Sequence, residues 1–254
     1  MRPLQRARFR SRMASRQRIW IATSLAALML IAAGVVFAPQ IYAHLELAPL
    51  RYDVIGVDVS HHQGQIDWRA LAGDGIAFAY IKATEGGNFR DTNFASNWAG
   101  AAGAGLVRGA YHFFTPCRTG IDQARNFIAT VPRDPSALPP AIDAERMGPC
   151  PNGAPIGNVA GELEILLAQL SAHYGRRPLI YTTAEFHDAY LKGQFPHDQF
   201  WVRGLFWPPL IRQEQWILWQ YQDRGARRGV HGPVDLSAFR GSKQDFTGFV
   251  HPNP

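Results

Sequence analysis

Short apolar runs alternate with helix-like stretches from Asp53 onward. The runs that predict strands are VIGVDVS (54–60), IAFAYIKAT (76–84), LVRGAYHFF (106–114), LPPAIDAE (138–145), RPLIYTT (177–183), QFWVRG (199–204) and WILWQY (216–221). Strands of nearly continuous apolar character, separated by helices, are typical of a mainly parallel sheet that is covered on both faces. We therefore predict an α/β fold, in the form of a compact, irregular β/α barrel. An open, doubly wound sheet is the competing architecture.

The segments between these runs have helical patterns. They are IDWRALAGD, DTNFASNWAGAAGAG, IDQARNFIATV, residues 156–174 and AEFHDAYLKG. The longest, 156–174, places Leu163, Leu166, Leu167 and Leu170 at the spacing i, i+3, i+4, i+7, and Gly175 follows it. This spacing predicts a helix with one buried face that ends at the glycine.

A different pattern precedes the alternating region. Residues 19–38 carry no charge, and as a helix they would extend about 30 Å, the thickness of a bilayer core. Seven arginines and no acid lie in residues 1–18, which favours a cytoplasmic position for this arm. The alternative is a cleaved signal peptide ending near Ala38, although Pro39 would obstruct cleavage there.

Four parts are predicted from this pattern. Residues 1–18 form a basic cytoplasmic arm, 19–38 a single transmembrane signal-anchor, 39–52 a tether and 53–245 the β/α barrel. The protein would then be a single-pass protein of the inner (cytoplasmic) membrane with its barrel in the periplasm, or a secreted protein if the leader is cleaved.

The charge of the chain belongs to the N-terminal arm. Lys and Arg number 26 against 20 Asp and Glu, a formal net charge of +6, but residues 19–254 hold 19 basic and 20 acidic residues. A nucleic-acid-binding protein needs its basic residues gathered on the folded surface. We therefore expect no nucleic-acid partner.

Two cysteines, Cys117 and Cys150, lie in proline-flanked loop sequences. An even number of cysteines outside the cytoplasm favours one disulfide, with two free buried thiols as the alternative. Neither cysteine has a close companion ligand of the CxxC kind, so no metal site is predicted.

Acidic residues follow several predicted strands, at the edge where a β/α barrel carries its functional groups. Asp143 and Glu145 form the sharpest pair, because residues two apart on a strand share a face with Cα atoms about 6.6 Å apart. Repulsion between two such carboxylates raises the pKa of one of them. Glycoside hydrolysis uses this arrangement, with one acid to protonate the leaving oxygen and one carboxylate to support the anomeric centre. A pair of solvated loop acids is the alternative.

Other candidate sites have weaker support. His61 and His62, with Asp58, suggest a metal site or a catalytic base, but adjacent strand residues point to opposite sides. Lys82 is a candidate Schiff-base lysine, although a salt bridge with a neighbouring acid is commoner. The strand-end aromatic residues Tyr111, Phe113, Tyr181, Trp219 and Tyr221 are candidates for stacking against sugar faces, and Gln220 lies among them.

Six ordered segments resemble glycoside hydrolase family 25, the lysozymes that act as N-acetylmuramidases. They are GVDVSHHQGQIDW, FAYIKATEG, DTNFASNWAGAAGAGLVRGAYHFF, LPPAIDAE, PLIYTTAEFHDAYL and LWQYQDRGARRGVHGPVDLSAF, which together cover about residues 53–240. The resemblance implies a flattened, irregular β/α barrel. It also implies a peptidoglycan hydrolase that cleaves the β-1,4 bond between N-acetylmuramic acid and N-acetylglucosamine with retention.

The resemblance also assigns roles. Glu145 is the expected general acid, and Asp143 stabilises the oxocarbenium ion or orients the substrate's N-acetyl group for internal attack. Asp58 and Asp235 line the groove and position this pair, and Glu85 has a supporting role at the substrate site. No metal or organic cofactor is implied. A noncatalytic glycan-binding module and another retaining glycosidase, such as a chitinase-like enzyme, remain as alternatives.

The sequence departs from the family pattern at two places. Ser237 stands where the family often has Asn, and Arg224, Arg227 and Arg228 make the stretch before Val234 rich in arginine. These differences leave the four acids in place and bear on the contacts at the rim of the groove.

Overall fold

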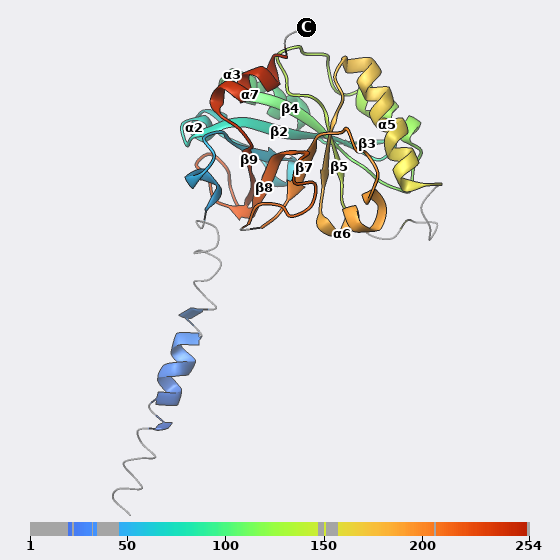
Figure 1. Ribbon diagram of the computed structural model, residues 1–254. Coiled ribbons are helices and arrows are strands. Elements are labelled where there is room, and N and C mark those ends of the chain that lie inside the picture. The colour runs from blue at the N-terminus through green and yellow to red at the C-terminus, as the bar shows by residue number, and fades with distance from the viewer. Residues whose placement is uncertain are drawn as a thin grey trace, which may run out of the picture. The chain divides into compact units, whose positions relative to one another are not determined.

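The computed structural model describes residues 20–21, 23–31, 33–34, 46–146, 150, 157–205 and 207–252 (Figure 1). The chain divides into two units, Met1–Leu45 and Glu46–Pro254. In the first unit, the described residues between 20 and 34 are helical. Among all the residues described, no helix is long and apolar enough to cross a membrane. The predicted span 19–38 lies partly outside this set.

The second unit is built on a closed barrel of eight strands. They are β1 (Ile55–Val59), β2 (Ile76–Glu85), β4 (Val107–Phe113), β5 (Ala141–Ala144), β6 (Leu179–Thr182), β7 (Phe200–Arg203), β8 (Trp216–Gly225) and β9 (Val234–Phe239). The order around the barrel is β1-β9-β8-β7-β6-β5-β4-β2, and a parallel pairing of β1 with β2 closes it. The short strand β3 (Phe89–Arg90) pairs with the end of β2. All seven predicted strands are present, and the closure rules out the open sheet.

Strand β9 is not among the runs that predicted strands in the sequence. It runs antiparallel to both of its neighbours, β1 and β8. Along it, Asp235, Ser237 and Phe239 face the barrel interior, whereas Val234, Leu236 and Ala238 belong to the outer core. This alternation is the two-residue period of a strand, which the polar residues Asp235 and Ser237 conceal in the sequence.

Helices cover the outside of the barrel (Figure 1). They are α2 (Trp68–Ala72), α3 (Phe94–Gly103), α4 (Gly120–Ile128), α5 (Val159–Tyr174) and α6 (Ala184–Phe186), with a π-helical turn η3 (His187–Leu191) directly after α6. Helix α5 begins after Asn158, whose side chain accepts hydrogen bonds from two backbone N–H groups. It ends at Gly175, which has a left-handed φ of 71° that glycine adopts without strain. Its four predicted leucines are fully buried, so the predicted helix and its buried face are confirmed.

Two apolar cores stabilise the body. The larger lies between the strands and the outer helices, and the smaller fills the barrel. The helix α7 (Lys243–Val250) closes the smaller core, because Phe246 and Val250 are buried in it and the Phe246 ring centroid lies 5.5 Å from that of Phe78. The folded body therefore extends past the predicted boundary at residue 245.

The N-terminal boundary of the body also differs from the prediction. Residues 46–52 were expected in the tether, but the compact unit begins at Glu46. The Glu46 carboxylate pairs with Arg227 and accepts a hydrogen bond from the Tyr221 hydroxyl at 3.0 Å. Ala48, in the 3₁₀ turn η1 (Ala48–Leu50), is buried, and the ring of Tyr52 packs on Trp216 and Trp219. These contacts hold residues 46–52 on the outside of β8. The rest of the predicted tether, residues 39–45, lies outside the described residues.

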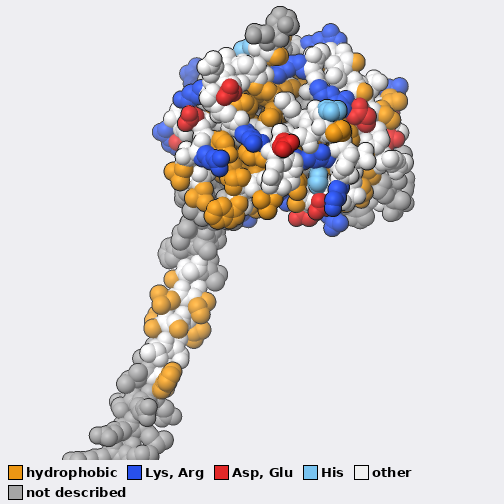
Figure 2. Space-filling view, viewed as in Figure 1, with side chains coloured by type: hydrophobic (Ala, Val, Ile, Leu, Met, Phe, Trp, Pro, Cys, Tyr) orange, Lys and Arg blue, Asp and Glu red, His pale blue; other side chains and the backbone are white. Residues whose placement is uncertain are grey.

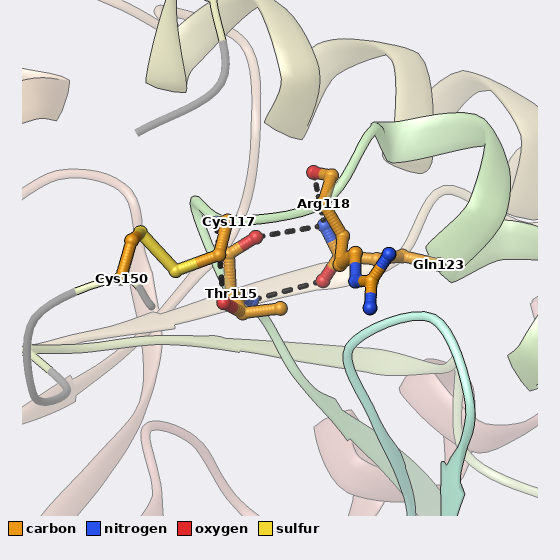
Figure 3. The surroundings of a disulfide bond; sticks show 5 residues. All are labelled: Thr115, Cys117, Arg118, Gln123 and Cys150. Atoms are coloured by element: carbon orange, nitrogen blue, oxygen red, sulfur yellow. Dashed lines mark hydrogen bonds between the residues drawn. A yellow bond between two sulfur atoms is a disulfide. The ribbon is translucent and has the colours of Figure 1, made fainter. Parts of the chain in front are cut away.

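A disulfide joins Cys117 to Cys150, as predicted (Figure 3). It connects the loop after β4 to the loop after β5, the strand that precedes Glu145. The first loop is further held by Gln123, whose Oε1 accepts from the Thr115 N–H at 2.9 Å and whose Nε2 donates to the carbonyls of Thr115 and Arg118. The disulfide therefore ties the Glu145 loop to a well-anchored neighbour.

Removing this bond is expected to destabilise the protein. The sequence separation of 33 residues corresponds, on the loop-entropy relation, to about 3 to 4 kcal/mol in the free energy of unfolding. Urea unfolding of the Cys117→Ser/Cys150→Ser variant should show this loss. The single Cys117→Ser variant is the matched control and should lose a similar amount. Equal stability of the oxidised wild type and the double variant would contradict the prediction.

Candidate active site

A cavity of about 240 Å³ lies at the carboxyl ends of the parallel strands. The four predicted acids Asp58, Asp143, Glu145 and Asp235 line it. Four of the predicted binding residues, Tyr111, Phe113, Tyr181 and Gln220, also line it. The barrel therefore gathers residues from β1, β4, β5, β6, β8 and β9 around one space, as expected for a β/α barrel.

Asp58 and Asp235 form a carboxyl pair on the cavity floor. They are directly opposite each other in the antiparallel ladder of β1 and β9, and their side chains share a hydrogen bond. Burial raises the pKa of Asp58 to about 7, partly offset by the hydrogen bond from Gln220. Burial, together with the charge of Asp58, raises the pKa of Asp235 to about 9. At neutral pH Asp235 therefore retains a proton.

Gln220 sets the direction of the hydrogen bonds around this pair. The Tyr181 hydroxyl donates to Gln220 Oε1 at 2.8 Å, and Gln220 Nε2 donates to Asp58 Oδ2 at 3.1 Å. All three side chains are buried. The amide nitrogen thus donates to the Asp58 carboxyl group, which favours the carboxylate form of Asp58 over the protonated form.

Asp143 and Glu145 form the second carboxyl pair. Burial raises the pKa of both groups; for Asp143 the charge of Glu145 adds to the increase and Lys82 opposes it, whereas for Glu145 Arg203 opposes the increase. Arg203 Nη1 lies 3.9 Å from Glu145 Oε2. Glu145 is the more open of the two, with 27% of its side chain exposed.

One oxygen of Asp143 lacks a partner in the described protein. Oδ1 of this residue is buried and accepts no hydrogen bond there. A buried carboxyl oxygen without a partner is costly, and such atoms in native proteins commonly bind a ligand. Asp143 lines the cavity, so its carboxyl group lies beside a bound molecule, while Oδ1 itself is enclosed by protein atoms.

Lys82 is held by a salt bridge and does not have the surroundings of a Schiff-base lysine. Its Nζ donates to Glu85 Oε2 at 2.7 Å and lies 4.9 Å from the centroid of the Phe113 ring. Lys82 lines the cavity, whereas Glu85 is outside its lining and reaches it through Lys82. Glu85 was predicted to contact a substrate, but in the structure it holds Lys82, and only Lys82 lines the cavity.

Trp219 and Tyr221 do not reach the cavity. Both are buried in the outer core; the Trp219 indole N–H donates to the Gly204 carbonyl, and the Tyr221 hydroxyl donates to Glu46. Since successive strand residues point to opposite faces, the inward position of Gln220 places both neighbours outside. The prediction that Trp219 binds substrate is wrong for this reason.

Three cavity residues were missed in the sequence: Trp201, Arg203 and Asp223. Trp201 and Arg203 are two apart on β7 and point inward together, so the alternation in QFWVRG was the signal that could have found them. The Trp201 indole N–H donates to Ser237 Oγ at 3.0 Å. The departure from the family pattern at Ser237 is therefore a contact inside the barrel.

The histidine pair has separate roles. His61 Nδ1 lies 2.7 Å from Oδ2 of the buried Asp91, whereas His62 lines the cavity. The hydroxyl of Ser60 caps the turn η2 (His61–Gln63) by accepting from the His62 N–H. Among the residues that the structure describes, no group of three or more His, Cys, Asp or Glu could hold a metal ion.

Comparison with known proteins agrees with the barrel fold. The family model "Glycosyl hydrolases family 25" matches residues 57–230. The uncharacterized protein YegX of Escherichia coli K12 is 35% identical over 212 residues, which cover 80% of this chain and 75% of that protein. Lysozyme M1 of Streptomyces globisporus is 37% identical over 204 residues, covering 74% of this chain and 68% of that protein.

Solved structures give the same result. A family 25 glycosyl hydrolase from Bacillus anthracis superposes with a TM-score of 0.74 at 37% identity, covering 82% of this chain and 97% of that one. A bacterial lysozyme from Streptomyces coelicolor superposes with a TM-score of 0.71 at 34% identity, covering 79% and 98%. With the acids of the resembling motifs gathered in one cavity, the chain belongs to glycosyl hydrolase family 25.

Proposed function

We propose that the protein is a lysozyme, an N-acetylmuramidase that hydrolyses the β-1,4 bond between N-acetylmuramic acid and N-acetylglucosamine in peptidoglycan. The observation that carries the proposal is the pair Asp143 and Glu145 in a cavity with three further carboxyl groups. Relatives with a matching sequence include Lysozyme M1 and an N,O-diacetylmuramidase of Arthroderma benhamiae, which is 33% identical over 138 residues.

Glu145 is suited to the role of general acid. Burial raises its pKa, so it holds a proton at a higher pH than an ordinary glutamate, and it is exposed enough to reach a glycosidic oxygen. It would protonate the leaving oxygen as the bond to the anomeric carbon breaks. In the second half of the reaction its carboxylate would take a proton from the attacking water.

Asp143 is suited to hold the 2-acetamido group. Its carboxyl group lines the cavity and would accept a hydrogen bond from the acetamido N–H, which turns the acetamido carbonyl oxygen toward the anomeric carbon. Attack by that oxygen, followed by attack of water, gives net retention, a known exception to the two-carboxylate scheme. Direct attack by Asp143 is the alternative, and it also retains configuration.

The remaining cavity groups would position this pair and the sugar. Tyr181, Gln220, Asp58 and Asp235 form one buried hydrogen-bonded group under the cavity. Tyr111 and Phe113 on the cavity wall offer aromatic surface to the apolar face of a sugar.

The two alternative functions make different demands on the site. A glycan-binding module has no need for carboxyl groups with raised pKa values, so the chemistry of the cavity favours an enzyme. A chitinase-like enzyme could use the same acids, and only a comparison of peptidoglycan with chitin oligosaccharides as substrates separates the two.

For the location of the enzyme, we infer from the sequence that residues 19–38 anchor it in the cytoplasmic membrane with the barrel in the periplasm. The uncharged 20-residue segment and the seven arginines before it support this topology. A disulfide between Cys117 and Cys150 suits an oxidising compartment.

Replacing the general acid should abolish turnover while leaving binding intact. We expect Glu145→Gln to lower kcat about 10²- to 10⁴-fold, because the leaving oxygen loses its proton donor. The assay is release of reducing ends from purified sacculi, with sedimentation on the same sacculi to measure binding. The exposed Glu214, replaced in Glu214→Gln, is the matched control. Full activity of Glu145→Gln would refute the proposal.

Arg203 should set the alkaline limit of activity. Its positive charge opposes the rise in the Glu145 pKa, so Arg203→Gln should raise that pKa further. Since the general acid must be protonated, the alkaline limb of the kcat/KM profile should move to higher pH, and Arg203→Lys should move it less. Arg146→Gln, which removes an exposed charge beside Glu145, is the control. An unmoved limb in Arg203→Gln would contradict the assignment.

The buried carboxyl pair should make the fold less stable as pH rises. The pKa values of Asp58 and Asp235 are raised in the folded state, to about 7 and about 9, from a usual value of 3.8. The folded state therefore binds these protons more tightly, and the stability they provide is lost between about pH 4 and pH 9. In Asp235→Asn the free energy of unfolding should fall by about 2 to 4 kcal/mol less over this pH range than in the wild type. Urea unfolding at several pH values measures this difference. If the free energy of unfolding falls equally steeply with pH in the wild type and in Asp235→Asn, the prediction is wrong.

A further inference from the structure

The most exposed large hydrophobic side chains of the barrel unit lie in two segments. Leu210 is 85% exposed, Leu50 is 83% exposed and Trp207 is 71% exposed. Every other large hydrophobic residue described in this unit is 44% exposed or less. Single exposed hydrophobic residues are ordinary, but a group of the three largest exposures calls for a partner.

Both segments flank the same buried residue, Trp219. The ring of Tyr52, two residues after Leu50, has its centroid 6.0 Å from that of Trp219. On the other side, the Trp219 indole N–H donates to the carbonyl of Gly204. A Cβ built on Gly204 would lie 2.9 Å from the carbonyl oxygen of Trp207. We call Leu47, Leu50, Trp207 and Leu210 the apolar face, and Figure 2 shows hydrophobic side chains gathered over the β8 side of the body.

The chemistry of the apolar face fits a lipid interface better than a glycan. Trp207 alone could stack on a sugar, but Leu47, Leu50 and Leu210 are aliphatic and have no ring to offer. Trp at the level of the lipid headgroups with aliphatic side chains beside it is the typical composition of an interfacial membrane contact. The exposed Arg51, next to Leu50, is balanced by the exposed Asp53, so the contact would depend on the apolar side chains.

The position of the apolar face in the chain points to the same partner. Glu46, clamped by Arg227 and Tyr221, is the first residue of the barrel unit, and Leu47 follows it. The anchor proposed above ends at residue 38. Residue 38 and Glu46 are eight Cα–Cα steps apart, which extend at most about 29 Å, so a bilayer surface would lie within that distance of Glu46.

We propose that the apolar face docks on the membrane interface and holds the barrel against the bilayer. The proposal rests on the proposed anchor and is independent of the catalytic assignment. Gly204, which contacts this face, follows the cavity residue Arg203 directly, so docking would keep the β7 side of the cavity close to the membrane. The substrate would then be the glycan nearest to the membrane.

The test places a fluorophore on the apolar face of the full chain. Leu210→Cys is labelled with a nitrobenzoxadiazole dye without reductant, since Cys117 and Cys150 are paired and stay unlabelled. The protein is reconstituted in vesicles of phosphatidylethanolamine and phosphatidylglycerol with and without nitroxide-labelled lipid. Ile165→Cys, on α5 and 38% exposed, is the matched control site.

We expect a blue-shifted emission and at least two-fold stronger lipid quenching at position 210 than at position 165. Adding Leu50→Ser and Trp207→Ser should lower the quenching at 210 to the level of the control, while the protein still floats with the vesicles. If positions 210 and 165 are quenched equally in protein that floats with the vesicles, the docking proposal is overturned and the anchor proposal is not. A blue shift that grows with the protein-to-lipid ratio, in the absence of lipid quenching, would mean that a second copy of the protein covers the apolar face. Loss of flotation would overturn both the anchor and the docking, whereas hydrolysis of sacculi would be unaffected.

Discussion

The pairing of β1 with β9 is the contact on which the site depends. It completes the barrel between β8 and β2, and its register puts Asp58 opposite Asp235 on the cavity floor. A parallel strand at this place would need a crossover connection, whereas an antiparallel strand needs only the loop from β8. The same pairing turns Ser237 inward to accept the hydrogen bond of Trp201. Closure of the sheet and the meeting of Asp58 with Asp235 are therefore one structural event.

Crowding carboxyl groups into a small buried space lowers the stability of the fold and raises the pKa values of these groups. Burial is the largest cause of the raised pKa at all four acids, and the charges of their neighbours add to it at Asp58, Asp143 and Asp235. The cations Lys82 and Arg203 each oppose the increase without removing it. The fold offsets this cost elsewhere, through two apolar cores and the disulfide beside the Glu145 loop.

The sequence was informative wherever one local pattern decided the structure. Apolar runs predicted seven strands, the leucine spacing predicted α5, and the position of Asp143 and Glu145 at a strand end predicted their shared cavity. It was uninformative where a neighbour distant in the chain decided the outcome. Trp219 and Gln220 are equally plausible at a strand end, and only the closed barrel determines that the amide points inward. Helix α7 was missed because its use as a plug depends on Phe78 and Phe239 from other elements.

The arginine-rich stretch at the end of β8 and just after it has a structural explanation that the sequence did not provide. Arg227 pairs with Glu46, and Arg228 pairs with Asp74 at 2.9 Å, so two of its three arginines hold the body together. Arg227 is only 11% exposed, which makes its contact with Glu46 stronger than an ordinary surface ion pair. This clamp fixes the point at which the chain enters the barrel.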